Sequence, residues 1–403
     1  MHRRGILVAV ALLLSTMLWG QGTISIKEID GRADRTPRRN LIHVAVPLLT
    51  IAPDSRAAGM GDLGVATQPD VNSQHWTLAK YALVPTRWGV SLSYVPWLAH
   101  LKANINLMYL AGYYRIDDWQ AVSASVRYFA LGTMQFTDYE GRIMQTHNPN
   151  EFAIDLGYSR RFIDDFTGGV AFRFIRSDLT GGYAQNNSIG SAKAGMSYAA
   201  DVALYYQRPF EIRKIPMEMA FGLAFTNMGS KISYNDVYKS FIPITLRVGG
   251  RCSMMLDQYN LLSLNLEASK LMVPTPPQRN IQGDIIRGKD PDVGVVTGMF
   301  QSFYDAPGGF SEEWHEVYWG LGLEYSYARQ FALRGGYFFE HQSKGGRQYV
   351  TLGLGVSYNV FTLDASYLIP TAGFNSPLAH TVRFSLMVNF KKPEKKSSSE
   401  VEE

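Results

Sequence analysis

The stretch PLLTIAPDSRAAGMGDLGVATQPDVNSQHWTLAK, residues 47–80, stands between a polar arm and a long series of strand-like segments. It is rich in small residues, which let backbones approach one another closely: Ala57, Ala58, Gly59, Gly61, Gly64 and Ala66. It is also rich in residues that form turns and caps: Asp54, Ser55, Asp62, Asp70, Asn72 and Ser73. We interpret the stretch as a compact plug around which the strands wrap; an ordinary N-terminal loop is the alternative.

Alternation of apolar and polar residues dominates the chain from Trp88 onward. Residues 121–130, 262–269, 350–358 and 381–390 each place apolar side chains on one face and polar or small ones on the other. A sheet with lipid on one side and water on the other has this pattern. A soluble antiparallel sandwich alternates as well, so the alternation alone does not decide between the two.

The lengths of the connections favour a membrane barrel. Links after the even-numbered strands are short, such as residues 163–165 and 257–259, whereas most links after odd-numbered strands are longer. Short turns at one rim and long loops at the other are typical of outer-membrane barrels. The short turns would then mark the periplasmic rim, and we expect the plug to enter the barrel from that side.

The sequence therefore predicts an all-β fold, a fourteen-stranded antiparallel transmembrane barrel over residues 87–390, with residues 47–86 as an N-terminal hatch, or plug. Fourteen is an even number, as closed bacterial barrels require. The expected strands lie near residues 88–97, 103–115, 119–131, 150–162, 166–177, 195–208, 217–227, 243–256, 260–271, 314–327, 330–341, 348–358, 360–369 and 379–390.

The composition agrees with a barrel and excludes several other classes of protein. Of the 403 residues, 18% are charged and 13% are aromatic. No internal run of about 18 apolar residues exists, which argues against a helical membrane protein. A net charge of +4 without a basic face gives no basis for nucleic-acid binding. The single Cys252 excludes an internal disulfide framework, and its place in the alternation makes it an apolar filler on the lipid side.

The two ends of the chain differ from the barrel. Residues 1–20 are typical of a secretory signal peptide, with Arg3 and Arg4 before a short apolar run, and a single membrane anchor is the alternative. Removing the signal would lower the net charge to +2. We expect residues 21–46 to form a polar periplasmic arm and residues 391–403 to form a solvated periplasmic tail.

Charged residues recur on the polar face of the predicted strands, which is the face toward the lumen. They are Arg127, Asp155, Arg173, Asp201, Glu218, Arg247, Arg251, Glu267, Glu324, Arg334, Asp364 and Arg383. One interpretation is a polar permeation path. The other is a network of ion pairs that fills the interior and fastens the plug, because charges in a confined lumen need partners. The mixture of both signs favours the network.

The longest connection, about residues 272–313, carries three prolines and then an apolar run. Its apolar members are Val293, Val295, Val296, Met299, Phe300, Phe303 and Tyr304. An exposed apolar segment on an extracellular loop would be a partner-binding surface. A lid that folds over the barrel mouth is the alternative, and the sequence does not choose between them.

No catalytic or metal-binding motif stands out. Residues 59–64, GMGDLG, lack the Lys and Ser/Thr of a phosphate-binding loop, and no G-x-S-x-G occurs. His315 is near Glu312 and Glu316, but on a strand His315 and Glu316 would point to opposite faces. We expect a protein that is not an enzyme and holds neither metal nor cofactor.

Several motifs early in the chain carry a family resemblance. They include Pro53-Asp54-Ser55-Arg56, Gly59-Met60-Gly61-Asp62, Gly64-Val65-Ala66-Thr67, Pro69-Asp70 and Asn72-Ser73-Gln74-His75-Trp76. They resemble the FadL-like fourteen-stranded barrels with an N-terminal hatch, and among these the chain is most similar to the PorV family of the type IX secretion system of Bacteroidetes. One departure is Thr77-Leu78-Ala79, where that family usually has Asn-Pro-Ala, which removes a turn-forming Asn and a Pro that fixes φ.

The resemblance implies a hatch motif made of Pro53, Asp54, Ser55, Arg56, Gly59, Gly61, Asp62, Gly64, Asp70, Asn72, Ser73 and Trp76. It also implies a non-enzymatic role in outer-membrane lipid. The barrel would take cargo that bears a shared C-terminal signal domain from the large translocon barrel, and would pass it to the attachment complex with the sortase PorU. The alternative is a FadL-like transporter of hydrophobic small molecules, which would need an apolar binding pocket. The small and charged lumen face argues mildly against it.

Overall fold

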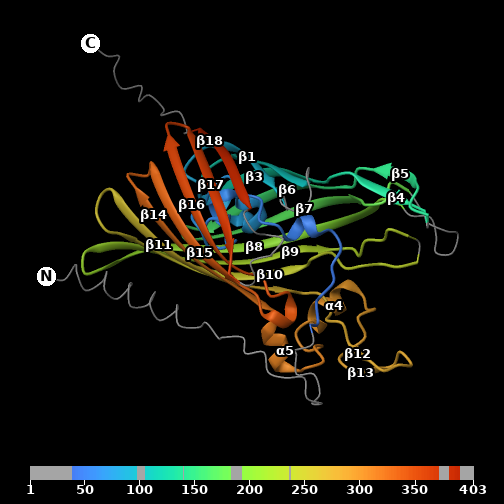
Figure 1. The fold of residues 1–403 in the computed structure, drawn as a ribbon. Helices are drawn as coiled ribbons and strands as arrows, with labels where there is room; N and C mark the ends of the chain where they lie inside the picture. The colour runs from blue at the N-terminus through green and yellow to red at the C-terminus, as the bar shows by residue number, and fades with distance from the viewer. Residues whose placement is uncertain are drawn as a thin grey trace, which may run out of the picture. The chain divides into compact units, whose positions relative to one another are not determined.

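The computed structural model describes residues 39–97, 105–138, 140–182, 193–235, 237–371 and 381–390. The predicted signal peptide, the predicted tail and most of the predicted arm lie outside these residues. Within them, fourteen antiparallel strands form a closed barrel, which confirms the predicted all-β, fourteen-stranded barrel (Figure 1). The strands of the barrel are β1 (Trp88–Pro96), β2 (Ile105–Arg115), β3 (Gln120–Leu131), β6 (Asn150–Ile163), β7 (Phe166–Asp178), β8 (Gly195–Ile212), β9 (Ile215–Gly229), β10 (Thr245–Met255), β11 (Asn260–Leu271), β14 (Val317–Tyr327), β15 (Phe331–Phe339), β16 (Gln348–Tyr358), β17 (Phe361–Pro370) and β18 (Val382–Phe390).

The alternation of side chains sorts each strand into an outer and an inner face. On β16, Leu352, Leu354 and Val356 are exposed on the outer face, whereas Thr351 and Gly353 are buried inside the barrel. An outward apolar face is the surface that lipid tails solvate, and the polar face is left for the lumen. The same alternation therefore explains why these sequences form strands and why the ring closes with its polar side inward.

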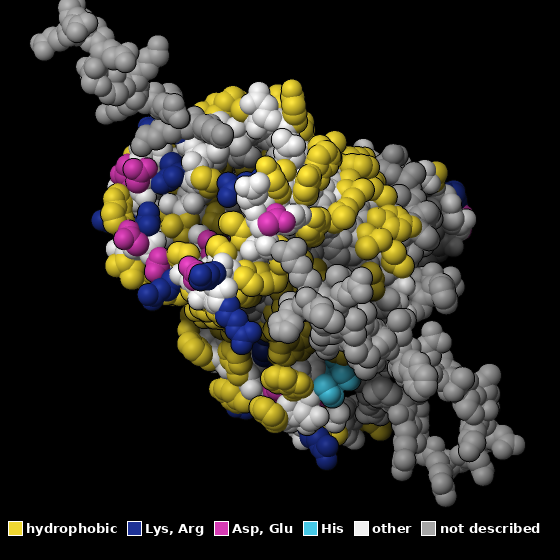
Figure 2. All heavy atoms as spheres, turned by 90° about the vertical axis from the view of Figure 1, so that its left-hand side faces the viewer, with side chains coloured by type: hydrophobic (Ala, Val, Ile, Leu, Met, Phe, Trp, Pro, Cys, Tyr) yellow, Lys and Arg dark blue, Asp and Glu magenta, His cyan; other side chains and the backbone are white. Residues whose placement is uncertain are grey.

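The two rims differ in the length of their connections. The short turns lie together at the left of Figure 1. None of the helices among the described residues is long and apolar enough to cross a membrane. Seen from this short-turn end, Lys, Arg, Asp and Glu side chains gather on one side of the view, around the barrel mouth, while apolar side chains cover the flank (Figure 2).

The long loops at the other rim carry elements that the alternation does not predict. The loop between β3 and β6 contains the hairpin of β4 (Met134–Thr137) and β5 (Ile143–His147). The loop between β11 and β14 contains β12 (Gln278–Arg279), β13 (Ile285–Arg287), α4 (Val295–Gln301) and α5 (Phe310–His315), and η3 (Gln342–Lys344) lies between β15 and β16. Because α5 extends to His315, the prediction that this residue is on a strand is wrong, and β14 begins only at Val317.

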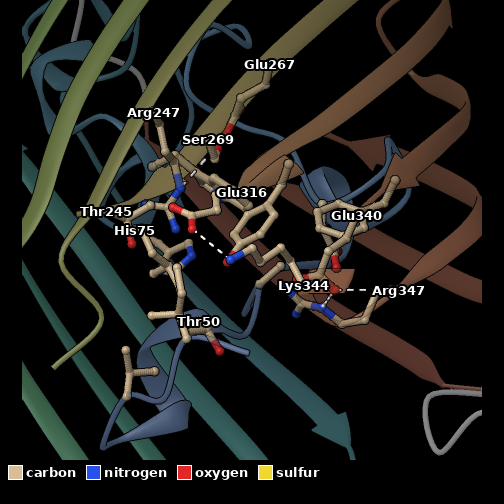
Figure 3. A pocket seen from close by; sticks show the side chains of 18 of the residues that line it. Thr50, His75, Thr245, Arg247, Glu267, Ser269, Glu316, Glu340, Lys344 and Arg347 are labelled. Carbon is tan, nitrogen blue, oxygen red and sulfur yellow. Dashed lines mark hydrogen bonds and ion pairs between the residues drawn. The ribbon is translucent and has the colours of Figure 1, made fainter. Parts of the chain in front are cut away.

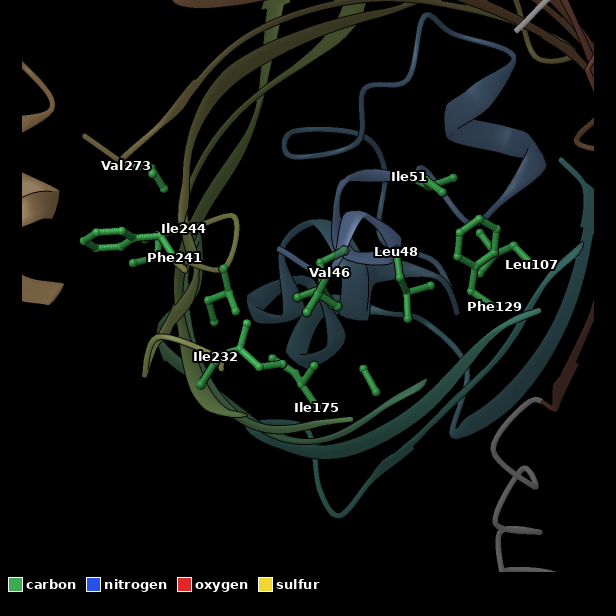
Figure 4. Close-up of a cluster of buried hydrophobic side chains, with 14 of the residues drawn as sticks. Val46, Leu48, Ile51, Leu107, Phe129, Ile175, Ile232, Phe241, Ile244 and Val273 are labelled. Atoms are coloured by element: carbon green, nitrogen blue, oxygen red, sulfur yellow. The ribbon is translucent and has the colours of Figure 1, made fainter. Parts of the chain in front are cut away.

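Residues 47–84, which we call the inner segment, run inside the ring of strands (Figure 4). They fold into four short helices, η1 (Pro47–Thr50), α2 (Ser55–Ala58), α3 (Ser73–Trp76) and η2 (Leu78–Leu83), joined by turns. The helix α2 contacts β16, β17 and β18, and η2 contacts strands on the opposite side, from β2 to β8. The inner segment thus bridges the lumen from wall to wall.

The direction of the chain through the lumen differs from the prediction. The backbone N–H of Asn40 donates to the carbonyl of Ser343, and that of Ala45 donates to the carbonyl of Phe241, at 2.9 Å in both cases. Ser343 and Phe241 belong to long loops, so residues 39–46 lie at the long-loop rim. The inner segment then leads into β1 at the short-turn rim. The expectation that the plug enters from the short-turn side is therefore wrong for the described part of the arm.

Candidate functional site: the junction of the inner segment with the barrel wall

Asp54 fixes the fold of the inner segment from within. It is the N-cap of α2, where its carboxylate accepts the backbone N–H of Ala57 at 2.9 Å, as expected for an Asp at this position. Its second oxygen accepts the indole N–H of Trp76 at 2.8 Å. This one buried carboxylate joins the start of α2 to the end of α3, although Asp54 and Trp76 are 22 residues apart in the sequence.

Arg56 ties the inner segment to β14. Its guanidinium donates two hydrogen bonds to the carboxylate of Glu324, at 3.0 and 2.8 Å, and a third to Asp70 at 2.9 Å. Glu324 also accepts from Arg334 at 2.6 Å, and Arg334 reaches Asp364 at 2.6 Å. The forked geometry of Arg suits this two-point contact, and the alternation of signs gives every buried charge a partner.

Two further carboxylates fasten the middle of the inner segment. Asp62 accepts the hydroxyl of Tyr349 at 2.6 Å and pairs with Arg383, so a turn of the inner segment is bound to β16 and β18. Glu267 of β11 accepts the backbone N–H groups of Gly64 and Val65, at 2.8 and 2.9 Å. The wall thus satisfies backbone donors of the connection between α2 and α3, where no helix pairs them.

Glycines of the inner segment meet glycines of the wall. Gly59 packs against Gly353, where a Cβ on Gly59 would lie 2.9 Å from the Gly353 Cα. Gly61 has a φ of +84°, a conformation that L side chains rarely adopt. On the wall, a Cβ on Gly322 would lie 2.6 Å from the carbonyl oxygen of Met60. The absence of side chains on both partners lets two backbones come together.

The remaining residues of the predicted hatch motif also lie inside the barrel, buried except for the partly buried Asp70. The backbone N–H of Ser55 donates to the hydroxyl of Ser385, and that hydroxyl donates to the hydroxyl of Ser55. The hydroxyl of Ser73 donates to the carboxylate of Asp70 at 3.2 Å. Pro53, Asn72 and Trp76 are buried. All twelve residues of the motif therefore belong to the inner segment, inside the barrel. That they close the pore stays a prediction.

Every predicted lumen charge points inward and belongs to an ion pair. Apart from the pairs above, these are Arg127–Asp155, Arg173–Asp155, Arg173–Asp201, Arg247–Glu267 and Arg251–Glu218. The Arg251–Glu218 distance is 2.6 Å and the Arg247–Glu267 distance is 3.8 Å. This geometry supports the network interpretation over an open polar path, since each charge is already compensated.

The predicted partner-binding run on the long loop is split between two environments. Val293, Val295 and Met299 pack against buried residues of the barrel rim. The other members face outward on and after α4: Val296, Phe300, Phe303 and Tyr304 are 67%, 64%, 43% and 59% exposed. The loop thus has a face that packs on the rim, as a lid would, and an outer apolar face, as a partner surface would.

A buried ionic cluster holds this loop to the rim. Lys270, at the end of β11, donates to Glu316 at 2.5 Å and to Glu313 at 3.0 Å. Lys344, from the loop between β15 and β16, donates to Glu316 at 2.9 Å and to Glu312 at 2.6 Å. Burial alone would raise the pKa of Glu312, but hydrogen bonds from Lys344 and other donors lower it below its ordinary value.

Two cavities adjoin the inner segment. One, of about 210 Å³, lies toward the long-loop rim and is lined by His75, Arg247 and Glu267 among others (Figure 3). The other, of about 700 Å³, lies toward the short-turn rim and includes Arg56 and Asp70 in its walls. Both mix charged and apolar side chains. In the described ranges, no group of three or more His, Cys, Asp and Glu side chains is arranged to hold a metal ion.

One set of wall residues that receive the inner segment was not predicted from the sequence. They are glycines at inward positions, where a Cβ would meet the inner segment at ordinary contact distance or closer: Gly169, Gly222, Gly249, Gly320, Gly322, Gly336 and Gly353. A signal was available, because all of them fall on the inward parity of their strands, opposite large apolar neighbours. Glycine at such a position indicates the close approach of another backbone.

The comparisons with known proteins identify a family. The family model described as type IX secretion system protein PorV matches residues 34–278. A comparison with curated proteins finds no match. Solved structures that align with the chain include the toluene transporter TbuX of Ralstonia pickettii, at 11% identity and a TM-score of 0.47, covering 84% of this chain and 98% of that chain. A FadL homologue of Pseudomonas aeruginosa aligns at 9% identity and a TM-score of 0.41, covering 87% of this chain and all of that chain.

Proposed function

Because the chain belongs to the PorV family of type IX secretion proteins, we propose that it takes secreted cargo from the large translocon barrel of that system and delivers it to the cell-surface attachment complex. The cargo would be recognised by a shared C-terminal signal domain, and the attachment complex would contain the sortase PorU. The role is that of a platform in outer-membrane lipid and involves no catalysis by this chain.

The outer face of α4 is the observation that carries this proposal. Val296 and Phe300 project from the helix, and Tyr304 follows in the next turn, all of them more than half exposed. Apolar and aromatic side chains that are grouped on a fixed support are typical of protein-binding surfaces. The ionic cluster around Lys270 and Glu316 supplies the fixed support, since it anchors the end of the loop to the barrel.

The inner segment would act as a hatch in this role. Arg56, Asp62 and the backbone at Gly64 are each bonded to a different strand of the wall. A segment fastened on several sides would keep the barrel sealed while cargo is handled at its outer surface. This supports a barrel that serves as a docking platform rather than as a conduit for the cargo.

The alternative is a transporter of hydrophobic small molecules, as in FadL-like proteins. Such a transporter needs an apolar pocket between the hatch and the wall. The cavity at the long-loop rim instead contains Arg247, Glu267 and Glu316, and the larger cavity contains Arg56, Glu324 and Arg334. Charged walls weigh against an apolar ligand, because burying unsolvated charge beside hydrocarbon is costly.

The test is capture of partners from detergent-solubilised outer membranes by the tagged protein, followed by mass spectrometry. The variant Val296→Ser/Phe300→Ser/Tyr304→Ser should lose the translocon barrel, the cargo or both, while its barrel remains folded. The matched control is Ile281→Ser, which changes a fully exposed apolar residue elsewhere in the same loop. Capture that is equal in the triple variant and the control would overturn the binding role of α4. Recovery of bound lipid or fatty acid alone would favour the transporter.

A further inference from the structure

Residues 39–45, which we call the strap, cross the long-loop rim in an extended conformation with no helix or strand of their own. Their side chains alternate, with Leu41 and His43 exposed and Ile42 and Val44 partly buried. The backbone makes hydrogen bonds to the rim near its two ends, from Asn40 and from Ala45. The strap is thus held by few hydrogen bonds and by the packing of Ile42, Val44 and Ala45 on the buried apolar cluster of the barrel, and its other face is open to solvent.

The side chain of Asn40 provides the firmest attachment at the far end of the strap. Its amide donates to the carbonyl of Pro276 at 3.1 Å and to the carboxylate of Glu312 at 2.9 Å. Glu312 is also bound by Lys344, and the rest of the ionic cluster does not involve the strap. The attachment at Asn40 can therefore be broken while the long loop keeps its own anchor.

Val46 marks a sharp change in the chain. Its backbone is in the left-handed region, with φ 56° and ψ 62°, where a β-branched residue is strained. Before Val46 the chain is half exposed; from Val46 onward Leu48 and Leu49 are buried, and the N–H of Leu48 donates to Glu151 at 3.2 Å. The strained residue separates a half-exposed strap from a buried inner segment, as a hinge would.

The strap forms part of the wall of the 210 Å³ cavity, through Ile42 and Val44. Thr245 and His75 line the same cavity (Figure 3). His75 is only 3% exposed, yet neither of its ring nitrogens hydrogen-bonds to a described residue. Removing the strap would take away one wall of the cavity and open these polar groups to solvent.

We propose that the strap is a movable cover, hinged at Val46 and fastened by Asn40, whose release opens a recess with charged and apolar walls at the long-loop rim. The recess is distinct from the outer face of α4, and the proposal does not depend on the identity of any secretion partner. It gives the barrel a second closure, outside the inner segment, that can open while the inner segment stays in place.

The test measures the reactivity of a cysteine placed under the strap, in purified full-length protein in detergent. Cys252→Ser removes the native thiol, and Thr245→Cys puts a reporter in the wall of the cavity. Adding Asn40→Ala should speed the reaction with a water-soluble maleimide by about thirtyfold, because two side-chain hydrogen bonds of about 1 kcal/mol each are lost. His43→Ala, on the exposed face of the same strap, should leave the rate unchanged.

A second reporter separates strap release from general loosening. Thr362→Cys places a thiol in the 700 Å³ cavity at the opposite rim. Strap release predicts that Asn40→Ala accelerates the thiol at position 245 and leaves that at position 362 unchanged. Equal rates with and without Asn40→Ala at position 245 would overturn the proposal. Acceleration of both reporters would also overturn it, since the variant would then have loosened the whole interior.

Discussion

Gly336 of β15 lies directly against the backbone of Met60, so that a Cβ on Gly336 would overlap the Met60 carbonyl group and the Gly61 nitrogen. Its neighbour Gly335 faces the other side of the strand, where a Cβ would find its nearest atom, the Thr351 carbonyl oxygen, at 4.0 Å. Two consecutive glycines therefore have opposite roles. Gly336 makes room for the backbone of the inner segment, and Gly335 is a small residue on the outer face.

This pair gives the first prediction. Gly336→Ala should force the inner segment away from β15, at a cost of about 1–3 kcal/mol for overpacking. Planar bilayers containing the variant should show a conductance that the parent protein lacks. Gly335→Ala should behave as the parent. If Gly336→Ala is as silent as Gly335→Ala, the inner segment does not seal the lumen as a hatch.

The second prediction concerns the carboxylate that binds Arg56 and Arg334. Glu324→Gln should lower the free energy of unfolding by about 3 kcal/mol, because it leaves two buried guanidinium groups undercompensated. The shift from folded to unfolded mobility on gels, followed with increasing temperature or urea, measures this change. Asp164→Asn breaks an exposed pair with Arg161 at 3.1 Å and should change the unfolding free energy by less than about 1 kcal/mol. Similar effects of the two substitutions would contradict a stabilising role for the buried network.

The third prediction is a pH dependence of the long loop. Burial and the nearby carboxylates of Glu313 and Glu316 raise the pKa of Asp305 to about 6, against the opposing hydrogen bond from the Thr275 N–H. Because this pKa lies above the ordinary value of 3.8, the folded loop favours the protonated form. The loop should therefore gain stability as the pH falls from about 6 toward 3.8 and lose that gain as the pH rises again.

Asp305→Asn tests this directly, since an amide cannot ionise. The ratio of loop cleavage rates, parent over variant, should be higher at pH 7.5 than at pH 5, and using the ratio cancels the protease's own dependence on pH. A ratio that does not vary with pH would show that Asp305 is ionised at both values.

The fourth prediction concerns which side of the membrane the strap occupies. If the short turns are periplasmic, the strap lies outside the cell. In a Cys252→Ser background, His43→Cys should react with a membrane-impermeant maleimide on intact cells. Gln258→Cys, in an exposed short turn, should react only after the outer membrane is opened. Protection of position 43 on intact cells would indicate that the strap is periplasmic, in agreement with the expectation from sequence.

Much of the barrel could be predicted because its determinants are local. A period of two along a strand fixes which residues face inward, so the inward position of charges such as Arg127 and Asp364 follows from neighbours in sequence. Turn residues at regular spacing give the number of strands. The same period of two also predicts that Cys252 lies on the outer face, where it is exposed.

The path of the arm and the details of the site could not be predicted, because their determinants are distant in sequence. Asn40 bonds to Glu312, 272 residues away, and no local pattern marks that contact. The direction in which the chain crosses the lumen depends on such contacts. The apolar run near Val295 was visible, but its division into a buried face and an outer face appears only once α4 has packed on the rim.

The pairing of β1 with β18 has a consequence for the order of assembly. Seven residue pairs, from Trp88–Phe390 to Tyr94–Phe384, join the first strand to the last and complete the ring. The chain just before Trp88 crosses the lumen and leaves at the far rim, so a ring that closed early would have to be threaded by a free end. Folded chains avoid threading. The pairing of β1 with β18 should therefore form last, around an inner segment that is already in contact with the other strands.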